Sequence, residues 1–513
     1  MCVGTLAHAA SPPDILVVVQ SLDDIVSLDP GGAFELSSIQ ACGSVYERLV
    51  RPDRDQPSIL RPSLAASWQI GADGHSLDFE LAPGARFAGG HPVRPEDVVF
   101  SLGRAVKLNL PAAVTLNALG WNADNIGRYL LKVDTRHVRI SWPQEVGPIF
   151  ALSVLAAPVA SIVDAVEVQQ HESGGDAGNH WLGSHSAGSG PFKIRRYIPH
   201  EALVLDANPS STGGAPLLKT IVLRNVADAA TRRLLVEVGD ADIARDLGPD
   251  QIAALQGKRG VKTLRWPSAT TYYLMLNTAN PANPALKNPA VWEAVRWLID
   301  YDGIAGKLLQ GQFQVHQAIL PAGFPGALNT TPYHLDVAKA RSILAAAGLG
   351  AGITIKLDVF NQPPFIDIAQ SMQATFAQGG INLQLIPTEA AEVYARIRSR
   401  QEEAAWLYWI PDYFDANSTA AAFASNGEGD AHTVAWRAGW EIPGLSAQTK
   451  AAVEARDPDT RNRLYLAIQQ AVQANSPFVF AFQERAELVM RDRVQGYSQG
   501  LDADMTYYDR VTK

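Results

Sequence analysis

Cysteine is almost absent from this sequence, and long apolar runs are missing. The two cysteines, Cys2 and Cys42, are too few for a disulfide framework or a cysteine-based metal cage. The most apolar stretch, residues 149–162, is interrupted by Pro158 and two serines, so it falls short of the roughly 20 apolar residues that a membrane helix needs. The sequence therefore predicts neither a disulfide-stapled chain nor a membrane-spanning one.

Concentrated positive charge is missing too. The net charge is −9, and no run of lysine and arginine resembles a nucleic-acid-binding stripe. Nucleic-acid binding is therefore not expected. With 47% hydrophobic and 19% charged residues, the composition is that of a globular chain, and 513 residues predict about three folding units.

The common enzyme motifs are absent as well. Gly188-Ser189-Gly190 is followed by Pro191 and lacks the helix that a nucleophile elbow requires, and no glycine-rich phosphate-binding motif occurs. The histidines between His171 and His185 lack the H-E-x-x-H spacing of a zinc site, so a solvated loop is expected there. We expect no catalytic residues, no metal ligands and no cofactor. A metal-dependent enzyme or metal carrier that uses this loop is the rival hypothesis.

The first residues resemble the end of an export signal. Ala7-His8-Ala9 follows an apolar segment and has the small-x-small pattern that signal peptidase cuts. Residues 1–13 are therefore predicted to be a signal-peptide remnant or disordered, and the alternative is a frayed terminus.

The first half of the chain is predicted to be rich in strands. A turn at Gly74 joins two alternating segments as a hairpin, and a helix is expected to start at Pro95 with acidic residues in its first turn. The other expected elements are strands at 15–20, 192–197, 202–206 and 220–226, and a helix at 36–49.

The second half changes to alternating strands and helices. Strands are predicted at 272–276, 353–359 and 381–386, and helices at 289–309, 336–347, 365–378 and 458–473. The strands predicted at 478–482 and 488–491 return to the strand-rich pattern of the first half. One domain is therefore expected to interrupt another.

Aspartates stand among aromatic rings in W-L-Y-W-I-P-D-Y-F-D, residues 406–415. A carboxylate in apolar surroundings is costly unless a partner pairs with it, so Asp412 and Asp415 each need a partner from the protein or from a ligand. Further rings, Trp266, Tyr272, Tyr273 and Trp436, lie near the expected domain junctions. Aromatic rings with a few polar anchors are typical of a small-molecule site.

From about Ile15 to Tyr497, the chain resembles the family 5 extracellular solute-binding proteins, the peptide- and nickel-binding class that serves ABC importers. The most specific match is residues 64–102, which include Trp68, Asp73-Gly74 and Glu96-Asp97-Val98. Leu28-Asp29-Pro30 and Gly188 to Phe192 fit the same pattern. A departure follows Asn208-Pro209, where Ser210 to Gly213 replace the usual aromatic pair. This loop is expected to be shorter or differently packed, without a functional role.

The resemblance implies an α/β, periplasmic binding protein-like fold of type II, with two lobes, an extra subdomain, and mixed sheets flanked by helices. Lobe I is expected to comprise residues 14–60, 186–270 and 484–513, with 61–185 as the extra subdomain. Residues 271–483 form lobe II, and the hinge is expected near 267–271 and 482–485.

Trp409-Ile410-Pro411-Asp412-Tyr413 matches the family's W-x-x-D-Y motif, whose aspartate meets the α-ammonium group of a bound peptide. The resemblance therefore implies that Asp412 is the amine anchor; the alternative is that it caps a backbone turn. Both places where a peptide-type arginine is expected, 404–406 and 359–362, lack a guanidinium. The predicted ligand-binding residues are Asp412, Trp409, Tyr413, Trp406, Tyr272, Tyr273, Phe34, Asn361 and Trp436.

The expected function is that of a monomeric, non-enzymatic periplasmic protein, exported in a Gram-negative bacterium. It would capture a small ligand between its lobes by closure and deliver it to an inner-membrane ABC permease. An oligopeptide or an amine-bearing, peptide-like metabolite is expected. A sugar- or opine-type cargo stays open, because the amides of Asn361 and Gln362 and the rings of Trp406 and Tyr408 suit an uncharged or hydroxylated ligand end. The resemblance also leaves a nickel- or haem-type cargo open, which would require histidines that face the cleft.

Overall fold

The chain divides into two compact units, each described by itself. The computed structural model describes residues 11–143, 145–426, 433–440 and 442–513. The first unit consists of Met1–Trp266 and Glu487–Lys513, and the second is Pro267–Ala486. Two long strands, β12 (Val261–Leu276) and β17 (Phe478–Arg491), contribute residues to both units. Most of the predicted export signal, residues 1–10, lies outside the described residues.

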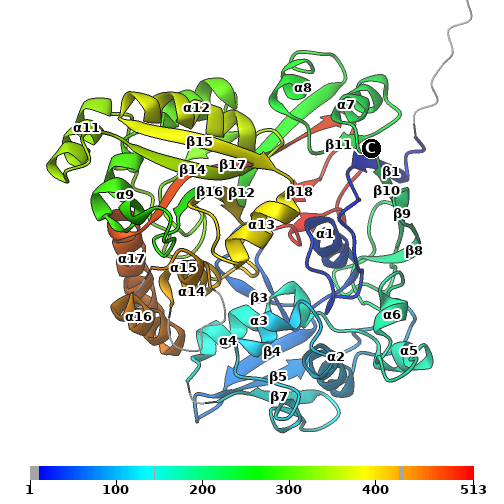
Figure 1. Cartoon of the computed structure of the whole chain (residues 1–513). Coiled ribbons are helices and arrows are strands. Elements are labelled where there is room, and N and C mark those ends of the chain that lie inside the picture. The colour runs from blue at the N-terminus through cyan, green and yellow to red at the C-terminus, as the bar shows by residue number, and fades with distance from the viewer. Residues whose placement is uncertain (1–10, 144, 427–432, 441) are drawn as a thin grey trace, which may run out of the picture. The chain divides into compact units, whose positions relative to one another are not determined.

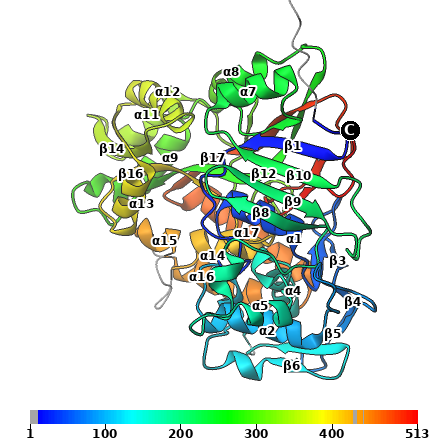
Figure 2. The ribbon, with the colours of Figure 1, turned by 90° about the vertical axis from the view of Figure 1, so that its right-hand side faces the viewer.

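A mixed sheet forms the centre of the first unit (Figures 1 and 2). Strand β1 (Ile15–Gln20) pairs in parallel with β10 (Thr220–Asn225) and with β11 (Ile243–Ala244). Strands β9 (Ala202–Ala207) and β8 (Phe192–Ile198) continue the sheet as antiparallel neighbours. The apolar run of β1 fits a strand covered on both faces, and its predicted bounds are confirmed.

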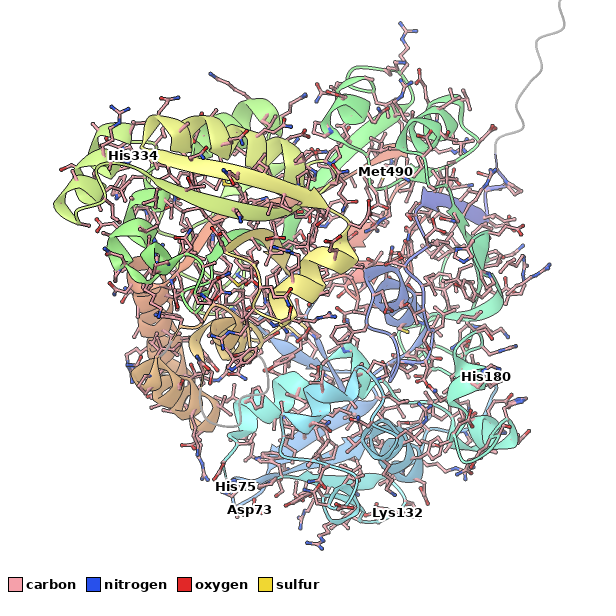
Figure 3. All side chains as sticks on the ribbon, viewed as in Figure 1. Asp73, His75, Lys132, His180, His334 and Met490 are labelled. Atoms are coloured by element: carbon pink, nitrogen blue, oxygen red, sulfur yellow. The ribbon has the colours of Figure 1, made fainter. Side chains whose placement is uncertain are left out.

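A second, antiparallel sheet in this unit has the order β4-β5-β7-β6. The predicted hairpin is confirmed as β4 (Ala65–Ile70) and β5 (Ser76–Leu81), and Gly74 at the turn has a φ of +71°. Asp73, labelled with His75 in Figure 3, accepts hydrogen bonds from the His75 amide at 2.9 Å and the Ser76 hydroxyl at 3.0 Å. Helix α2 (Pro95–Lys107) starts at the predicted proline.

The other elements of the first unit are mostly short. They are α1 (Leu36–Val45), β2 (Val50–Pro52), β3 (Leu60–Pro62), α3 (Ala113–Asn117), β6 (Leu130–Lys132), β7 (His137–Ser141), α4 (Pro148–Leu155), α5 (Ala165–Gln170), α6 (Asn179–Leu182), α7 (Ala229–Val238), α8 (Pro249–Ala253), β18 (Ser498–Gln499) and β19 (Thr506–Tyr507).

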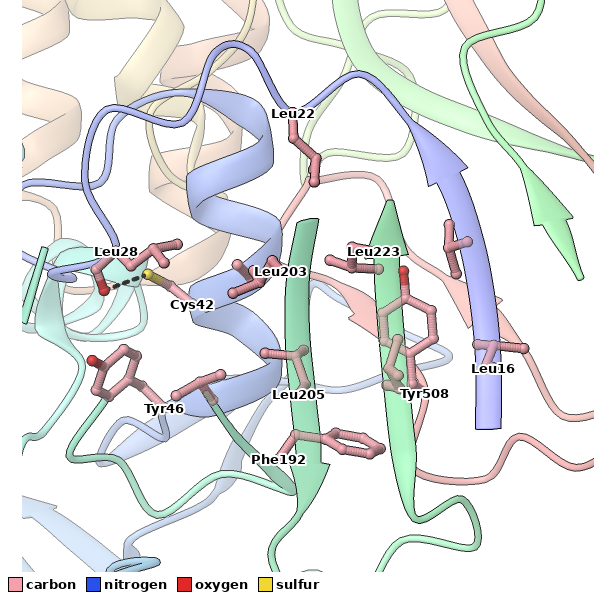
Figure 4. Close-up of a cluster of buried hydrophobic side chains, with 14 of the residues drawn as sticks. Leu16, Leu22, Leu28, Cys42, Tyr46, Phe192, Leu203, Leu205, Leu223 and Tyr508 are labelled. Carbon is pink, nitrogen blue, oxygen red and sulfur yellow. Dashed lines mark hydrogen bonds between the residues drawn. The ribbon is translucent and has the colours of Figure 1, made fainter. Parts of the chain in front are cut away.

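A buried ion pair lies beside the apolar core of this unit. Figure 4 shows part of that core. Asp29 is 0% exposed, and its carboxylate accepts two hydrogen bonds from Arg104 of α2, at 2.9 and 2.6 Å. The same carboxylate accepts the amide of Gly31. Two buried opposite charges with their hydrogen bonds satisfied fix the loop before α1 against α2.

The second unit is an α/β unit, as predicted. Its sheet has the order β15-β14-β16-β12-β17, with β13 beside β17. Its elements, besides the two shared strands, are α9 (Pro289–Arg296), α10 (Tyr301–Gly303), β13 (Phe313–Val315), α11 (Val337–Ala346), β14 (Ile353–Phe360), α12 (Phe365–Gln378), β15 (Ile381–Thr388), α13 (Ala390–Arg398), β16 (Ala404–Trp409), α14 (Ala416–Ala424), α15 (Val434–Arg437), α16 (Pro443–Glu454) and α17 (Pro458–Asn475).

Five predicted elements were wrong in extent. The strand expected at 272–276 already begins at Val261, as the long strand β12. The helix expected at 36–49 ends at Val45, because Tyr46 is extended. The helix expected at 289–309 is broken after Arg296, and Asp300 caps a new turn by accepting the Gly303 amide. The two strands expected at 478–482 and 488–491 are one strand, β17. Its polar middle is paired, since Glu484 lies opposite Phe313 of β13.

Among the described residues, no helix has both the length and the apolar character needed to cross a membrane.

The buried pair predicts a large effect on stability. Arg104→Met leaves the Asp29 carboxylate buried without its partner, so we expect the free energy of unfolding of the first unit to fall by about 3–5 kcal/mol. Urea denaturation followed by circular dichroism measures the change. Arg139→Met, which breaks the exposed Arg139–Asp78 pair on the surface sheet, is the matched control and should cost less than about 1 kcal/mol.

Candidate functional site

The aromatic and acidic segment begins on β16, inside the sheet of the second unit. β16 runs parallel to β14 and antiparallel to β12, so that Tyr408 lies opposite Tyr272. The chain leaves the carboxyl end of β16 toward Asp412 and the carboxyl end of β14 toward Asn361. Polar groups at the carboxyl ends of neighbouring parallel strands are where open α/β sheets bind ligands. Asn361 and Gln362 are both exposed.

The aromatic rings of β12 and β16 are divided between the two faces of the sheet. Tyr272 packs against Phe313, with ring centroids 4.7 Å apart, and lies 6.4 Å from Trp406. Tyr273 points to the other face, where Phe480 stacks on it at 5.1 Å. A single small ligand therefore cannot contact all the rings that the sequence singled out.

Trp406 is 0% exposed and packs against Phe482. Its burial argues against direct ligand contact, because no part of its ring reaches the surface of the structure. Trp406 instead belongs to the apolar core behind β16. The sequence could not distinguish this role from ligand contact, because aromatic rings dominate both settings.

Asp415 obtains its partner from the protein. Its buried carboxylate accepts a hydrogen bond of 2.6 Å from Arg461 of α17 and a bond of 2.8 Å from the Asn417 amide, so it also caps α14. The buried Tyr413 belongs to the same network, since its hydroxyl accepts from the Asn417 side chain at 3.3 Å. The capping role considered as the alternative for Asp412 is therefore filled by Asp415.

Asp412 is different, although it lies only three residues away. Its side chain is exposed, and within the described part of the chain its carboxylate has no hydrogen-bond or ion-pair partner. Only its amide is bound, donating to the Ser418 hydroxyl at 2.8 Å. Surrounding protein desolvates the carboxylate and raises the pKa of Asp412 to about 6. An unpaired, partly desolvated carboxylate that solvent can reach is suited to bind a cation.

The remaining predicted residues lie in varied surroundings. Trp409 is half-buried, donates through its indole N–H to the Thr419 hydroxyl at 3.2 Å, and packs its ring edge-on against Phe423. Trp436 lies under the guanidinium of Arg400, 4.6 Å from the ring centroid. Phe34 belongs to the first unit, where it is 46% exposed just before α1.

Two guanidiniums that the sequence analysis missed have no carboxylate partner within the described residues. Arg398 ends α13, is exposed and lies 5.7 Å from the ring of Tyr394. Arg437 ends α15 and is half-buried, with its Nε enclosed and without a hydrogen-bond partner. Burial lowers the pKa of Arg437, and the neighbouring Tyr273 opposes this effect. The sequence offered one indication of these two arginines, because both stand at helix ends, where basic residues are favoured.

Glu402 does not neutralise these guanidiniums. It is 0% exposed, and neither carboxylate oxygen has a hydrogen-bond partner among the described residues. Desolvation raises the pKa of Glu402 to about 8, so this side chain is mostly protonated at neutral pH. Nearby, Arg396 is already paired with the buried Asp358 at 2.5 Å. The positive charges of Arg398 and Arg437 therefore remain available to a ligand.

The histidine loop of the first unit is built around a stacked trio of rings. Trp181 lies between His171 and His185, with centroid distances of 4.1 and 5.0 Å and nearly parallel planes. His180, labelled in Figure 3, is not part of this stack. Across the described ranges, no group of three or more histidine, cysteine or acidic residues could hold a metal ion. The rival hypothesis of a metal site gains no support here.

Comparisons with known proteins agree on one family. Residues 60–431 match the bacterial extracellular solute-binding proteins, family 5 Middle. The chain is 28% identical over 499 residues to the probable D,D-dipeptide-binding periplasmic protein DdpA of Escherichia coli K12, covering 96% of this chain and 93% of that protein. It is 23% identical to the glutathione-binding protein GsiB of Escherichia coli O157:H7, covering 96% and 92%.

A solved structure with a similar fold is the periplasmic binding protein DppA of Helicobacter pylori, in complex with the peptide STSA. The TM-score is 0.79 at 22% sequence identity, and the match covers 97% of this chain and 98% of that one. At this level of identity the match shows the fold alone. The predicted fold class is confirmed.

The contrast between the two aspartates predicts opposite effects on stability. Arg461→Met leaves Asp415 buried without its cation, and we expect it to cost about 3–5 kcal/mol. Asp412→Asn should keep or raise the melting temperature at pH 7. A raised carboxyl pKa costs stability in full above about pH 6, and this cost is lost as the pH falls from about 6 to the unfolded value near 4. Thermal unfolding without ligand measures both changes, and marked destabilisation by Asp412→Asn would show that Asp412 is structural.

Proposed function

The chain belongs to family 5 of the bacterial extracellular solute-binding proteins, and from that premise we propose that it captures a peptide-like ligand carrying both an ammonium and a carboxylate group. Members of this family are binding components of transport systems, not enzymes. The unpaired Asp412 carboxylate carries the proposal. It lies in a setting where the neighbouring Asp415 is fully paired, so its missing partner is best supplied by cargo.

Asp412 receives the ammonium group of the ligand. A neutral competitor would leave the partly desolvated carboxylate unpaired, so the site selects for a cation. Trp409, held by Thr419 and Phe423, provides an apolar wall next to this anchor. The amide side chains of Asn361 and Gln362 lie at the end of the adjacent strand, where they can hydrogen-bond the peptide groups of the ligand.

Arg398 and Arg437 receive the carboxylate end. The two positions where a peptide-type arginine is expected carry no guanidinium, and this absence favours an uncharged ligand end. Two guanidiniums of the same unit have no carboxylate partner in the described part of the chain, and Glu402 is mostly neutral, so both observations support a zwitterionic peptide. Guanidinium groups bind carboxylates with paired hydrogen bonds. The names of two relatives, which concern a D,D-dipeptide and glutathione, agree with this class of cargo.

The transport role follows from the family. We propose that the protein works as a monomer in the periplasm, where ligand bound to the second unit is enclosed by closure of the first and the closed form is presented to an ABC permease. The ligand would stabilise the closed state through the contacts it makes only there. Phe34, exposed in the first unit, is a candidate for such a contact. A hydroxylated conjugate of an amine is the second candidate cargo, because Asn361 and Gln362 present amides.

Binding measurements with D-alanyl-D-alanine and glutathione test the amine anchor. We expect Asp412→Asn to weaken binding by about 2–4 kcal/mol, roughly 30- to 1,000-fold, in isothermal titration calorimetry. Wild-type affinity should also fall as the pH drops through about 6, because protonation removes the negative charge of Asp412, and the variant should show no such dependence. Asp302→Asn, which changes an acidic residue elsewhere in the second unit, is the control. Equal affinity of Asp412→Asn and wild type would refute the anchor.

A second experiment tests the carboxylate end. Arg437→Gln and Arg398→Gln should each weaken binding of the free peptide by about tenfold or more, but leave binding of the C-terminally amidated peptide unchanged. The reason is that the amide has no charge for the guanidinium to pair. If both forms of the peptide lose affinity equally, the arginines support the fold instead of reading the carboxylate.

A further inference from the structure

The first unit contains a polar cavity that the proposed function does not use. Its volume is about 440 Å³, and it is bounded by the end of α1, the β2–β3 hairpin, the loop at 211–214 and the segment at 504–510. All of its lining residues belong to the first unit. A cavity of this size is within the usual range for small-molecule sites.

The loop at 211–214 leaves this space open. Its sequence, Ser211-Thr212-Gly213-Gly214, contains no side chain larger than threonine, and Gly214 has a φ of +93°, a conformation that a larger residue would adopt only under strain. The Thr212 hydroxyl donates to Glu47 at 2.6 Å, so the loop is tied to the wall of the cavity. The loop was expected to have no functional role, and its position on the cavity changes that expectation.

Most of the charges around the cavity are already paired with one another. Arg48 contacts Asp504 at 2.6 Å, and Arg54 contacts both oxygens of Asp509 at 2.8 and 2.9 Å. Asp53 is paired with Arg61, whose hydrogen bond is the main cause that lowers the pKa of Asp53 to about 2. These groups form a rigid polar frame and are not available to a ligand without breaking an ion pair.

Arg51 is the exception. It lies on β2 directly opposite Arg61 of β3, lines the cavity and is exposed. Within the described ranges its guanidinium has neither an ion pair nor a hydrogen bond. Arg510, also on the lining, approaches Asp509 only at 3.9 Å and is 74% exposed. Two acids of the lining, Asp55 and Glu47, also lack an ion pair in the same ranges. Glu47 accepts the hydrogen bond from Thr212, and burial raises the pKa of Glu47. The charge of Arg51 partly offsets the raised pKa of Glu47, but within the described ranges the hydrogen-bond donors of its guanidinium are free for a ligand.

We propose that this cavity is a second binding site, for a small oxyanion with carboxylate or phosphate groups, and that Arg51 is its main ligand-binding residue. The fork of the guanidinium pairs with two oxygens of such an anion. Arg510 and the hydroxyl groups of Ser211 and Thr212 provide further donors around it. The volume suits a metabolite-sized polyanion better than a single inorganic ion. The site is independent of the peptide proposal, because none of its residues belongs to the second unit.

Calorimetric titration of the full chain with citrate and with inorganic phosphate tests this site. We expect wild type to bind at least one of the two anions with a measurable dissociation constant, and the preferred anion identifies the chemical source. Arg51→Gln should weaken that binding at least tenfold. Arg139→Gln removes the same charge from the surface sheet of the first unit, where neither Arg139 nor its partner Asp78 lines the cavity, and should bind like wild type. Asp412→Asn should also bind the anion normally, whether or not it has lost peptide affinity.

A filling variant gives an independent readout. Ser211→Trp places a ring into the cavity without removing any charge, so anion binding should be lost while the melting temperature without ligand stays near that of wild type. The proposal is overturned if wild type binds neither anion at millimolar concentration, or if Arg51→Gln and Arg139→Gln lose affinity equally. Unchanged binding by Ser211→Trp would also overturn it, because the anion would then lie elsewhere.

Discussion

The ion pair between Asp415 and Arg461 is the contact on which the candidate site depends. Burying a carboxylate and a guanidinium together is tolerated only when their geometry is good, and the 2.6 Å contact meets that requirement. Because Asp415 also caps α14, the pair fixes where the helix begins and how the chain leaves β16. Asp412 lies in the segment between β16 and α14. Its amide donates to the Ser418 hydroxyl, and its carboxylate has no hydrogen-bond or ion-pair partner among the described residues. One aspartate is thus paired within the protein, and the other is the anchor in the proposed function.

The same division between structural and available charge recurs in the second unit. Asp358 and Arg396 neutralise each other, and Glu402 is kept mostly neutral by complete burial. Arg398 and Arg437 are left with positive charge and no carboxylate partner among the described residues. Among the described residues, one unit therefore holds charges of both signs without an ion-pair partner, which is the pattern that a zwitterionic ligand requires. Neither set could be recognised from the charged residues of the sequence alone, because pairing decides which charges remain.

The first unit follows a similar logic at two places. Asp29 and Arg104 are buried together and join α2 to the loop that carries Phe34. Around the polar cavity, the pairs of Arg48 and Arg54 brace the walls, and Arg51 stays unpaired within the described ranges. At the first place both charges are satisfied by each other, and at the second the paired charges stand around one guanidinium without a partner in those ranges. Unsatisfied groups are costly, and a protein keeps them where a partner arrives from outside.

The sequence alone determined the class of fold and most of its elements. The apolar run at 15–20 predicted β1, and the pattern of apolar residues predicted β14 and α12 with nearly their observed bounds, because such patterns reflect which faces are buried. The family pattern pointed to Asp412. Only the tertiary structure decided that Asp415 is paired, that Trp406 is core and that Arg398 and Arg437 have no carboxylate partner in the described part of the chain. Each of these depends on contacts between residues far apart in the chain, such as Asp415 with Arg461, and local sequence carries no record of such contacts.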